Sequence, residues 1–234
     1  MKLYLFNQKR NRDLDAYLDK LNITPETYKV LNRADKRVLL IGGGFSLLEP
    51  LFITETVMEI INIDLDPPRR NILPRLKNVK GDFTQNEDYI DLFDEVWALY
   101  SLPLYSPDKY SVFMFVFKAI LAIKDTGIIR FFPLEYDWSS KLHTKDADYD
   151  MTTMECTNNV IEALDYVKIL GVESVQEVLN SIDEDRAEAL VTLHINLEKT
   201  TKQKINDTLF KKIIDYKETN QTQGSVTIVS KNDD

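Results

Sequence analysis

The chain has 234 residues, and 44% of them are hydrophobic, which is enough for one substantial domain with a buried core. Its 38 acidic residues outnumber its 29 basic residues and give a formal net charge of −9. This balance argues against a nucleic-acid partner, because phosphate binding depends on Lys and Arg. The longest apolar run, residues 112–123, is interrupted by Lys118 and is too short to cross a bilayer, so we expect no membrane segment.

Cysteine usage indicates a reducing compartment and no zinc site. Cys156 is the single cysteine, so no internal disulfide can form, and no Cys/His cluster has the spacing of metal ligands. We therefore expect a cytoplasmic protein without a bound metal.

Residues 1–35 carry the signals of a helical segment that precedes the core. Asp13 and Asp15 open one polar and apolar stretch, and Thr24-Pro25-Glu26 supplies a cap, a first-turn proline and an acid for a second. Two short helices are predicted before the first strand.

From residue 36 onward, strands alternate with helices, which predicts an α/β fold with a doubly wound, mostly parallel sheet. Helices are expected at 45–56 and at 107–124, the second with Ser106 as cap and Pro107 in its first turn. The expected strands are 37–41, 57–64, 79–82, 95–100 and 127–132.

After Pro133 the pattern becomes less regular. Residues 135–159 are polar without clear periodicity, which suits a lid or a surface loop. Strands in this part are expected to lie at one edge of the sheet, as late antiparallel additions. The later expectations are helices at 160–166, 175–181 and 200–223 and strands at 167–172, 189–197 and 225–230.

The strongest functional signal is the glycine turn Gly42-Gly43-Gly44 directly after a buried strand, followed by Phe45 and Ser46. Residues without a Cβ let the backbone turn sharply and approach a ligand, and the following helix start offers amide donors. The alternative is a tight strand-to-helix turn that needs glycine for its geometry alone.

Two acids follow neighbouring strands. Asp64 stands twenty-two positions after Gly42 at the end of the second strand, where an acid in a nucleotide-binding α/β fold binds the ribose hydroxyls. Asp82 follows the third strand and suits an adenine amino group, with Phe83 or Leu65 against the ring. Each acid has a simpler interpretation, as a residue that stabilises a turn.

Together these features resemble the class I S-adenosylmethionine-dependent methyltransferases, which have a Rossmann-like fold. The resemblance covers about residues 36–133 and implies one cofactor-binding domain, 36–234, behind the helical segment 1–35. It implies that Gly42, Gly44 and Ser46 line the methionine part of S-adenosylmethionine, that Asp64 binds ribose, and that Leu65, Asp82 and Phe83 border adenine.

The chain departs from that family at three places. Leu40 stands where the family usually has an acid that helps to fix the methionine amino group. Ser101-Leu102-Pro103 differs from the fourth-strand motifs of amino-group methyltransferases. The three glycines after an apolar residue also resemble the aminopropyltransferases, but Phe45-Ser46-Leu47 replaces the acid-rich continuation of that family.

Catalytic candidates lie where the fourth strand ends. Methyl transfer requires alignment of a nucleophile with the methyl group and a base where the nucleophile must lose a proton. The first candidates are Tyr100, Ser101 and Tyr105. Glu135, Tyr136 and His143 are further candidates from the polar segment, and each candidate also has an ordinary packing or surface interpretation.

The helix at 107–124 is apolar around nearly its whole circumference, so the face turned away from the sheet needs a cover. A second helix, the polar segment or a second copy of the chain would supply it, and the last would make a homo-oligomer.

Three functions fit these observations. The first is a methyltransferase that acts on a small molecule or a protein. The second is a non-catalytic domain that keeps the fold to bind a partner or to sense the cofactor, which Leu40 and the atypical fourth-strand motif favour. The third is an NAD-dependent oxidoreductase, although Leu47 occupies the third glycine position of the dinucleotide-binding motif.

Overall fold

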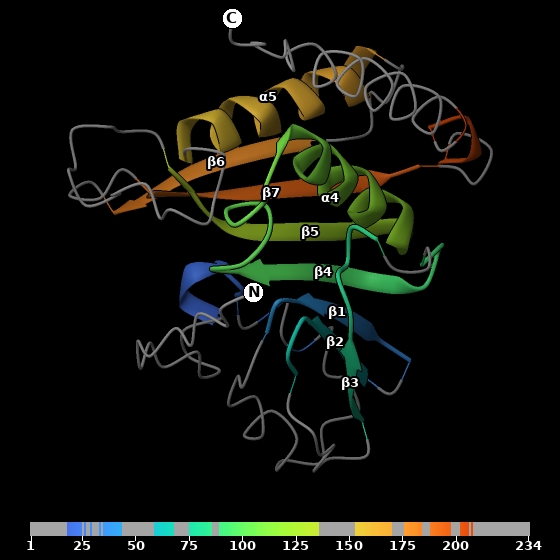
Figure 1. The fold of residues 1–234 in the computed structure, drawn as a ribbon. Helices are drawn as coiled ribbons and strands as arrows, with labels where there is room; N and C mark the ends of the chain where they lie inside the picture. The colour runs from blue at the N-terminus through green and yellow to red at the C-terminus, as the bar shows by residue number, and fades with distance from the viewer. Residues whose placement is uncertain are drawn as a thin grey trace, which may run out of the picture.

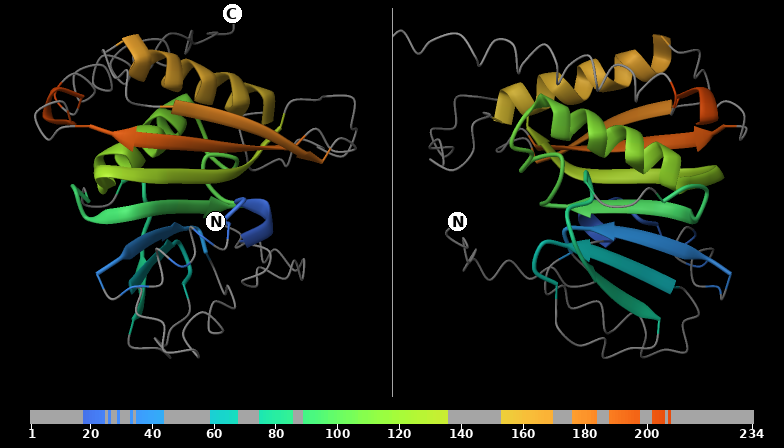
Figure 2. Two further views of the ribbon diagram at one scale, coloured as in Figure 1. Left: turned by 180° about the vertical axis from the view of Figure 1, so that it is seen from behind. Right: turned by 45° about the vertical axis from the view of Figure 1, so that its right-hand side comes forward.

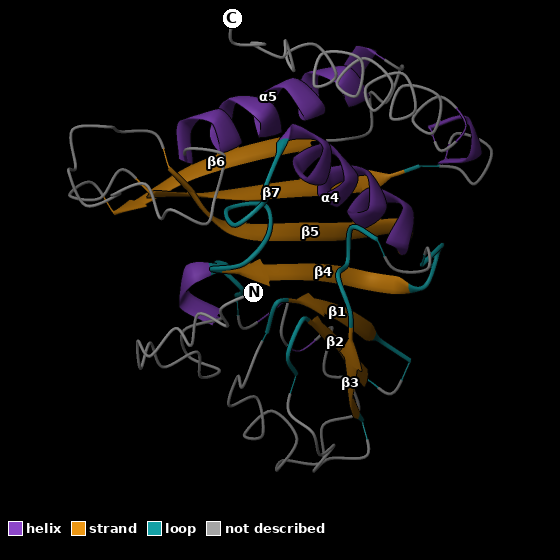
Figure 3. Ribbon diagram, in the orientation of Figure 1, coloured by secondary structure: helices purple, strands orange, loops and turns teal. Residues whose placement is uncertain are grey.

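The computed structural model describes residues 18–24, 26, 29, 33, 35–43, 59–67, 75–85, 89–135, 153–169, 176–183, 188–197, 202–205 and 207. These residues form an α/β fold of seven strands and two long helices (Figures 1 and 3). The elements are β1 (Arg37–Ile41), β2 (Glu59–Asp64), β3 (Leu76–Lys80), β4 (Phe93–Leu99), α4 (Lys109–Ala122), β5 (Ile123–Glu135), α5 (Thr153–Ile169), β6 (Gln176–Asp183) and β7 (Glu188–Asn196).

The strands form one sheet in the order β3-β2-β1-β4-β5-β7-β6. The pairs from β3 to β5 are all parallel, whereas β7 is antiparallel to both β5 and β6. The predicted fold class, a mostly parallel doubly wound sheet with late antiparallel edge strands, is therefore confirmed. The strand order reverses between β1 and β4. From β1 the chain adds β2 and β3 on one side, and from β4 it adds the later strands on the other side.

One face of the sheet is covered by α4 and α5 (Figure 2). β1, β4, β5 and β7 direct alternate apolar residues to this side, as the two-residue period of a strand requires. The ring of Phe115 on α4 lies edge-on to that of Phe131 on β5, with their centroids 5.5 Å apart. This layer is the larger hydrophobic core.

The cover of α4 comes from α5 of the same chain. Phe117 contacts the Tyr166 ring of α5 with a centroid distance of 6.4 Å, and Lys109 forms an ion pair of 2.6 Å with Glu162. The apolar circumference of this helix is thus explained by a sheet on one side and a helix on another. Of the three covers considered for residues 107–124, a second helix is the one that the structure shows, and the homo-oligomer has no support from it.

Other local predictions after residue 100 also need correction. α4 begins two residues later than expected, because the side chain of Asp108 accepts the amide of Ser111 and is the cap in place of Ser106. Residues 153–159 belong to α5, which also contains residues predicted as the strand 167–172. The helix predicted at 175–181 is strand β6, where pairing with β7 overrides the local pattern.

A second core lies on the opposite face. Trp97 and Phe132 are fully buried there, together with Leu40 of β1. Leu21 and Ile23 of the N-terminal segment pack against them and are 0% and 5% exposed. Residues 18–23 of the segment 1–35 therefore pack against this face of the sheet.

This second face also contains a buried ion pair. Glu95 of β4 and Arg130 of β5 pair directly, and the indole nitrogen of Trp97 donates to the same carboxylate at 2.6 Å. Burial raises the pKa of the Glu95 carboxyl above its usual value, although Arg130 and Trp97 favour the ionised form. Removing either partner alone would leave a buried group without its counterpart.

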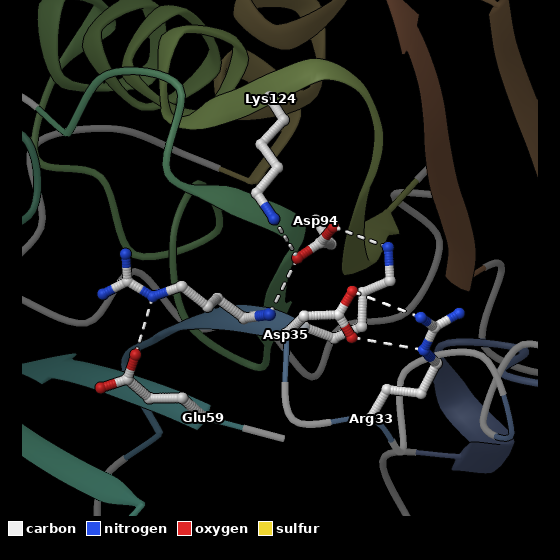
Figure 4. Close-up of polar contacts among 7 residues, drawn as sticks. Arg33, Asp35, Glu59, Asp94 and Lys124 are labelled. Atoms are coloured by element: carbon white, nitrogen blue, oxygen red, sulfur yellow. Dashed lines mark hydrogen bonds and ion pairs between the residues drawn. The ribbon is translucent and has the colours of Figure 1, made fainter. Parts of the chain in front are cut away.

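The amino ends of the central strands are joined by a surface network of ion pairs (Figure 4). Asp94 receives the Lys124 ammonium at 2.8 Å, the Lys36 ammonium at 3.2 Å and the backbone amide of Arg37 at 2.8 Å. Burial alone would raise the pKa of Asp94, but these donors outweigh it and hold the pKa below its ordinary value of 3.8. The network therefore ties β1, β4 and β5 together at the edge opposite the glycine turn.

We predict that Asp94→Asn lowers the free energy of unfolding at pH 7 by about 1–3 kcal/mol, because it removes charge-assisted hydrogen bonds from a largely buried carboxylate. Because the folded pKa of Asp94 is depressed, its contribution to stability is complete above the ordinary value of 3.8 and is lost as the pH falls through the folded pKa. Urea unfolding at pH 7 and at pH 3 measures both effects.

The matched control is Asp35→Asn at the same edge. Asp35 pairs with Arg33, and both side chains are more than 60% exposed, so a change of less than about 0.5 kcal/mol is expected. A loss for Asp94→Asn that stays the same at both pH values would contradict the assigned role of its charge.

Candidate functional site

The predicted site residues gather at the carboxyl ends of the parallel strands. Gly42 follows β1, Asp64 ends β2, Asp82 comes shortly after β3, and Tyr100 and Ser101 follow β4. The strand order reverses between β1 and β4. Open α/β sheets bind ligands outside the carboxyl ends of their strands at such a point of reversal.

Gly42 is required by both its conformation and its surroundings. Its φ is +63°, a backbone angle that residues with a side chain rarely adopt. Its amide donates to the Ile63 carbonyl at 2.7 Å. A Cβ at this position would lie 2.4 Å from the Cβ of Ser101. The ends of β1, β2 and β4 therefore meet in a contact that only glycine permits.

Gly43 is held by a residue that sequence reasoning missed. Its amide donates to the Asn62 side-chain oxygen at 3.1 Å, and the Asn62 amide group donates to Asn78 of β3 at 2.9 Å. A Cβ on Gly43 would meet Leu40 and this Asn62 oxygen at 2.5 and 2.6 Å. A polar residue inside the apolar strand 60–63 was the available signal, because buried amides need partners.

Ser101 clamps β4 to β1. Its hydroxyl donates to the Ile41 carbonyl at 2.7 Å, and the residue is 8% exposed. This hydrogen bond gives the Ser101 hydroxyl a structural role at the end of β1.

The two tyrosine candidates lie on either side of Ser101. Tyr100 has an unusual φ of +48°, donates its amide to the Phe132 carbonyl at 2.7 Å, and places its ring edge-on to that of Phe132. Tyr105 is half-buried, and its amide donates to the Ser101 carbonyl at 3.3 Å. Both belong to the connection that leads from β4 to α4.

Asp64 lies at the carboxyl edge in a short turn. One of its carboxylate oxygens accepts the amide of Asp66 at 2.8 Å, and its carbonyl accepts the amide of Gly81 at 2.9 Å. Leu65 beside it is 66% exposed, which is unusual for a large apolar side chain. The pair offers a carboxylate and an apolar surface next to each other.

Asp82 and Phe83 have different surroundings. One oxygen of Asp82 accepts both the amide and the hydroxyl of Thr84, at 2.8 and 2.7 Å, so this acid stabilises its own turn. Phe83 is 4% exposed, and its ring packs edge-on to Phe115 in the larger core. Of the two apolar residues expected beside adenine, Leu65 is the exposed one.

Several predicted residues lie outside the described part of the chain. These are Gly44 and Ser46 of the glycine turn, with Tyr136 and His143 of the polar segment, and the side chain of Glu135 is likewise not described. Within the described ranges, no group of three or more His, Cys, Asp or Glu side chains is placed to hold a metal ion. The helices found there are all too short or too polar to span a membrane.

Comparisons with known proteins show which fold this is. The chain resembles a chain from the complex of the Haloferax volcanii methyltransferase activator Trm112 with its candidate methyltransferase, at 14% identity and a TM-score of 0.52, covering 79% of this chain and 92% of that one. It resembles the [4+2]-cyclase SpnF at 10% identity and a TM-score of 0.52, covering 79% and 80%. A third similar structure is a S-adenosylmethionine-dependent methyltransferase from Methanosarcina mazei, at 11% identity and a TM-score of 0.49, covering 75% and 99%.

The chain has the class I methyltransferase fold. No protein-family model and no curated protein sequence matches it. Because one similar structure is a cyclase, the methyltransferase fold does not by itself decide the reaction, and function has to be argued from the residues of the site.

We predict that Gly42→Ala lowers the free energy of unfolding by about 2–5 kcal/mol, since it adds a strained backbone conformation to an overpacked contact. Adding Ser101→Gly removes the Cβ that the new methyl group would meet. Chemical denaturation of the two single variants and the double variant forms a double-mutant cycle.

The cycle is expected to show a favourable coupling, with the double variant recovering part of the loss caused by Gly42→Ala. Strictly additive losses would mean that the approach of Gly42 to Ser101 does not constrain this turn.

Proposed function

We propose that the chain binds S-adenosylmethionine at the carboxyl edge of the sheet and is a methyltransferase that acts on a small molecule or a protein. The observation that carries this proposal is the position of Asp64, at the end of β2 and next to the glycine turn that closes β1. The methyltransferase fold supports the same class of cofactor.

The chemistry of the described residues fits the adenosine part of this cofactor. A carboxylate accepts hydrogen bonds at about four positions, so the Asp66 amide does not exhaust the capacity of Asp64 to accept ribose hydroxyls. The exposed side chain of Leu65 offers an apolar surface to the adenine ring. We further propose that Asp82 borders the adenine amino group, while its bonds to Thr84 hold the carboxylate in place.

The glycine turn is less suited to NAD. A dinucleotide needs backbone amides that point to its pyrophosphate. The amides of Gly42 and Gly43 both donate to groups of the protein, and Leu47 replaces the third glycine of the motif. These two observations favour a cofactor without a pyrophosphate group.

When bound, S-adenosylmethionine supplies a methyl group that passes to a nucleophile's lone pair as the carbon–sulfur bond breaks. The residues of this chain would bind and orient the reactants, which is the main requirement of such a transfer. Asp64 would fix the ribose, and the connection after β4 would form the wall on the acceptor side. Tyr100 and Tyr105 remain the proposed contacts to the acceptor from that wall.

A second candidate is a non-catalytic domain that binds the cofactor or a partner. Leu40, which replaces the usual acid, is 1% exposed and belongs to the second core, and the Ser101 hydroxyl is engaged with Ile41. Neither residue is arranged for proton transfer, which is the specific observation in favour of this candidate.

We propose that the protein works in the reducing cytosol, because the sequence contains no second cysteine with which Cys156 could form an internal disulfide. Its net charge of −9 disfavours a nucleic-acid acceptor, so small molecules and proteins are the acceptor classes that we propose.

Calorimetric titration with S-adenosylmethionine, S-adenosylhomocysteine and NAD tests the cofactor. We expect binding of the first two and none of NAD. Binding of NAD alone would overturn the proposal.

Two variants that remove one negative charge each test the ribose contact. Asp64→Asn keeps an oxygen for the Asp66 amide but loses the charge, so S-adenosylhomocysteine should bind about 1–3 kcal/mol more weakly. Asp66→Asn removes the neighbouring exposed charge and should leave the affinity within about 0.5 kcal/mol of wild type. Equal affinities for wild type and Asp64→Asn would reject Asp64 as the ribose ligand.

Transfer of a labelled methyl group separates the enzyme from the non-catalytic domain. The protein is incubated with methyl-labelled S-adenosylmethionine and either the small-molecule or the protein fraction of a cell extract. An enzyme gives label in one fraction that depends on Asp64, whereas cofactor binding without transfer to either fraction favours the non-catalytic domain.

A further inference from the structure

The N-terminal segment reaches the carboxyl edge of the sheet. Residues 18–20 form a helical turn that lies beside the arrowhead of β4 in each view (Figures 1 and 2). Leu21 and Ile23 are buried against a core that includes Leu40 and Leu99. Leu40 is the second-last residue of β1, and Leu99 is the last residue of β4. This segment therefore packs directly beside the carboxyl ends of those strands.

Lys20 brings a positive charge to that place. Its ammonium lies 5.6 Å from the ring centroid of Phe132, and Phe132 pairs in register with Leu99 at the end of β4. The Lys20 side chain is 29% exposed, so most of its surface is covered while the ammonium stays over the ring. Its ion pair with Asp19 is 3.9 Å long, and Asp19 is 73% exposed, so this pair is weak and exchangeable.

Three contacts link Lys20 to the glycine turn. Phe132, under the ammonium, accepts the amide of Tyr100 and contacts its ring at 5.4 Å. The next residue, Ser101, bonds to the carbonyl before Gly42. Tyr100 keeps its positive φ within this chain of contacts, and backbone strain of this kind concentrates at functional sites.

The same corner lacks the usual recognition of an amino group. Leu40 is buried in the second core, and the amide of Gly43 is bonded to Asn62. Among the described residues, this corner has the cation of Lys20 over Phe132 and the buried, apolar Leu40 on β1. A cation suits the carboxylate at the amino-acid end of the cofactor.

We propose that Lys20 pairs with the carboxylate of the methionine part of the bound cofactor, so that the N-terminal segment forms one wall of the cofactor site. This inference rests on the proposed function and adds a recognition residue that neither the glycine turn nor the two acids would supply. Lys20 acts by binding and takes no part in the transfer of the methyl group.

Two probes separate this contact from the rest of the site. S-adenosylhomocysteine carries the carboxylate, whereas 5′-methylthioadenosine has the adenosine and the sulfur without the amino-acid end. We expect Lys20→Met to lower the affinity for S-adenosylhomocysteine by about tenfold, because a charge-assisted hydrogen bond is lost. The affinity for 5′-methylthioadenosine should not change. Calorimetry measures all affinities.

Two further variants control for charge and for folding. Lys29→Met removes an exposed lysine from the same N-terminal region and should change neither affinity. Lys20→Arg keeps the cation over Phe132 and should retain most of the affinity for S-adenosylhomocysteine. Thermal unfolding confirms that each variant is folded at the temperature of the titration.

The possible failures are distinguishable. If the wild-type protein binds neither probe, the proposed function itself is wrong. If it binds S-adenosylhomocysteine and Lys20→Met binds it equally well, the cofactor is accepted but the role of Lys20 is wrong. If Lys20→Met lowers the affinities for both probes equally, Lys20 only supports the structure, and the inference is overturned as well.

Discussion

The approach of Gly42 to Ser101 determines how the ends of β1 and β4 come together. A Cβ on Gly42 would lie 2.4 Å from that of Ser101, and the Ser101 hydroxyl closes the contact by donating to the Ile41 carbonyl. The Gly42 amide extends the same junction to Ile63 of β2. Because the strand order reverses here, this junction lies at the point where open α/β sheets bind their ligands, and the candidate site is built on it.

The two ends of the sheet serve different purposes. At the amino end, donors from β1 and β5 bind the Asp94 carboxylate and lower its pKa. The charge of Asp94 therefore holds these strands together. At the carboxyl end, Asp64 accepts an amide of its own turn and stands beside the exposed Leu65. Asp94 therefore supports the fold at one end, whereas Asp64 at the other end is the acid that we propose to bind a ligand.

Much of the fold was predictable because the parallel strands are short apolar runs ended by glycine, proline or acidic residues. The positions of Gly42 and Asp64 followed from the same local patterns. β6 was mistaken for a helix because its identity depends on pairing with β7, which is a long-range contact. Asn62 and Lys20 were missed because their contacts are with Gly43 and Phe132, which lie 19 and 112 positions away along the chain.

We propose that an adenosine-containing cofactor lies over the junction of β1 and β4 with its ribose at Asp64. A crystal structure of the protein with S-adenosylhomocysteine tests it most directly. The account predicts the ligand above Gly42, with its ribose hydroxyls within hydrogen-bonding distance of the Asp64 carboxylate. A ligand bound elsewhere, or one at this edge whose ribose does not contact Asp64, would contradict it.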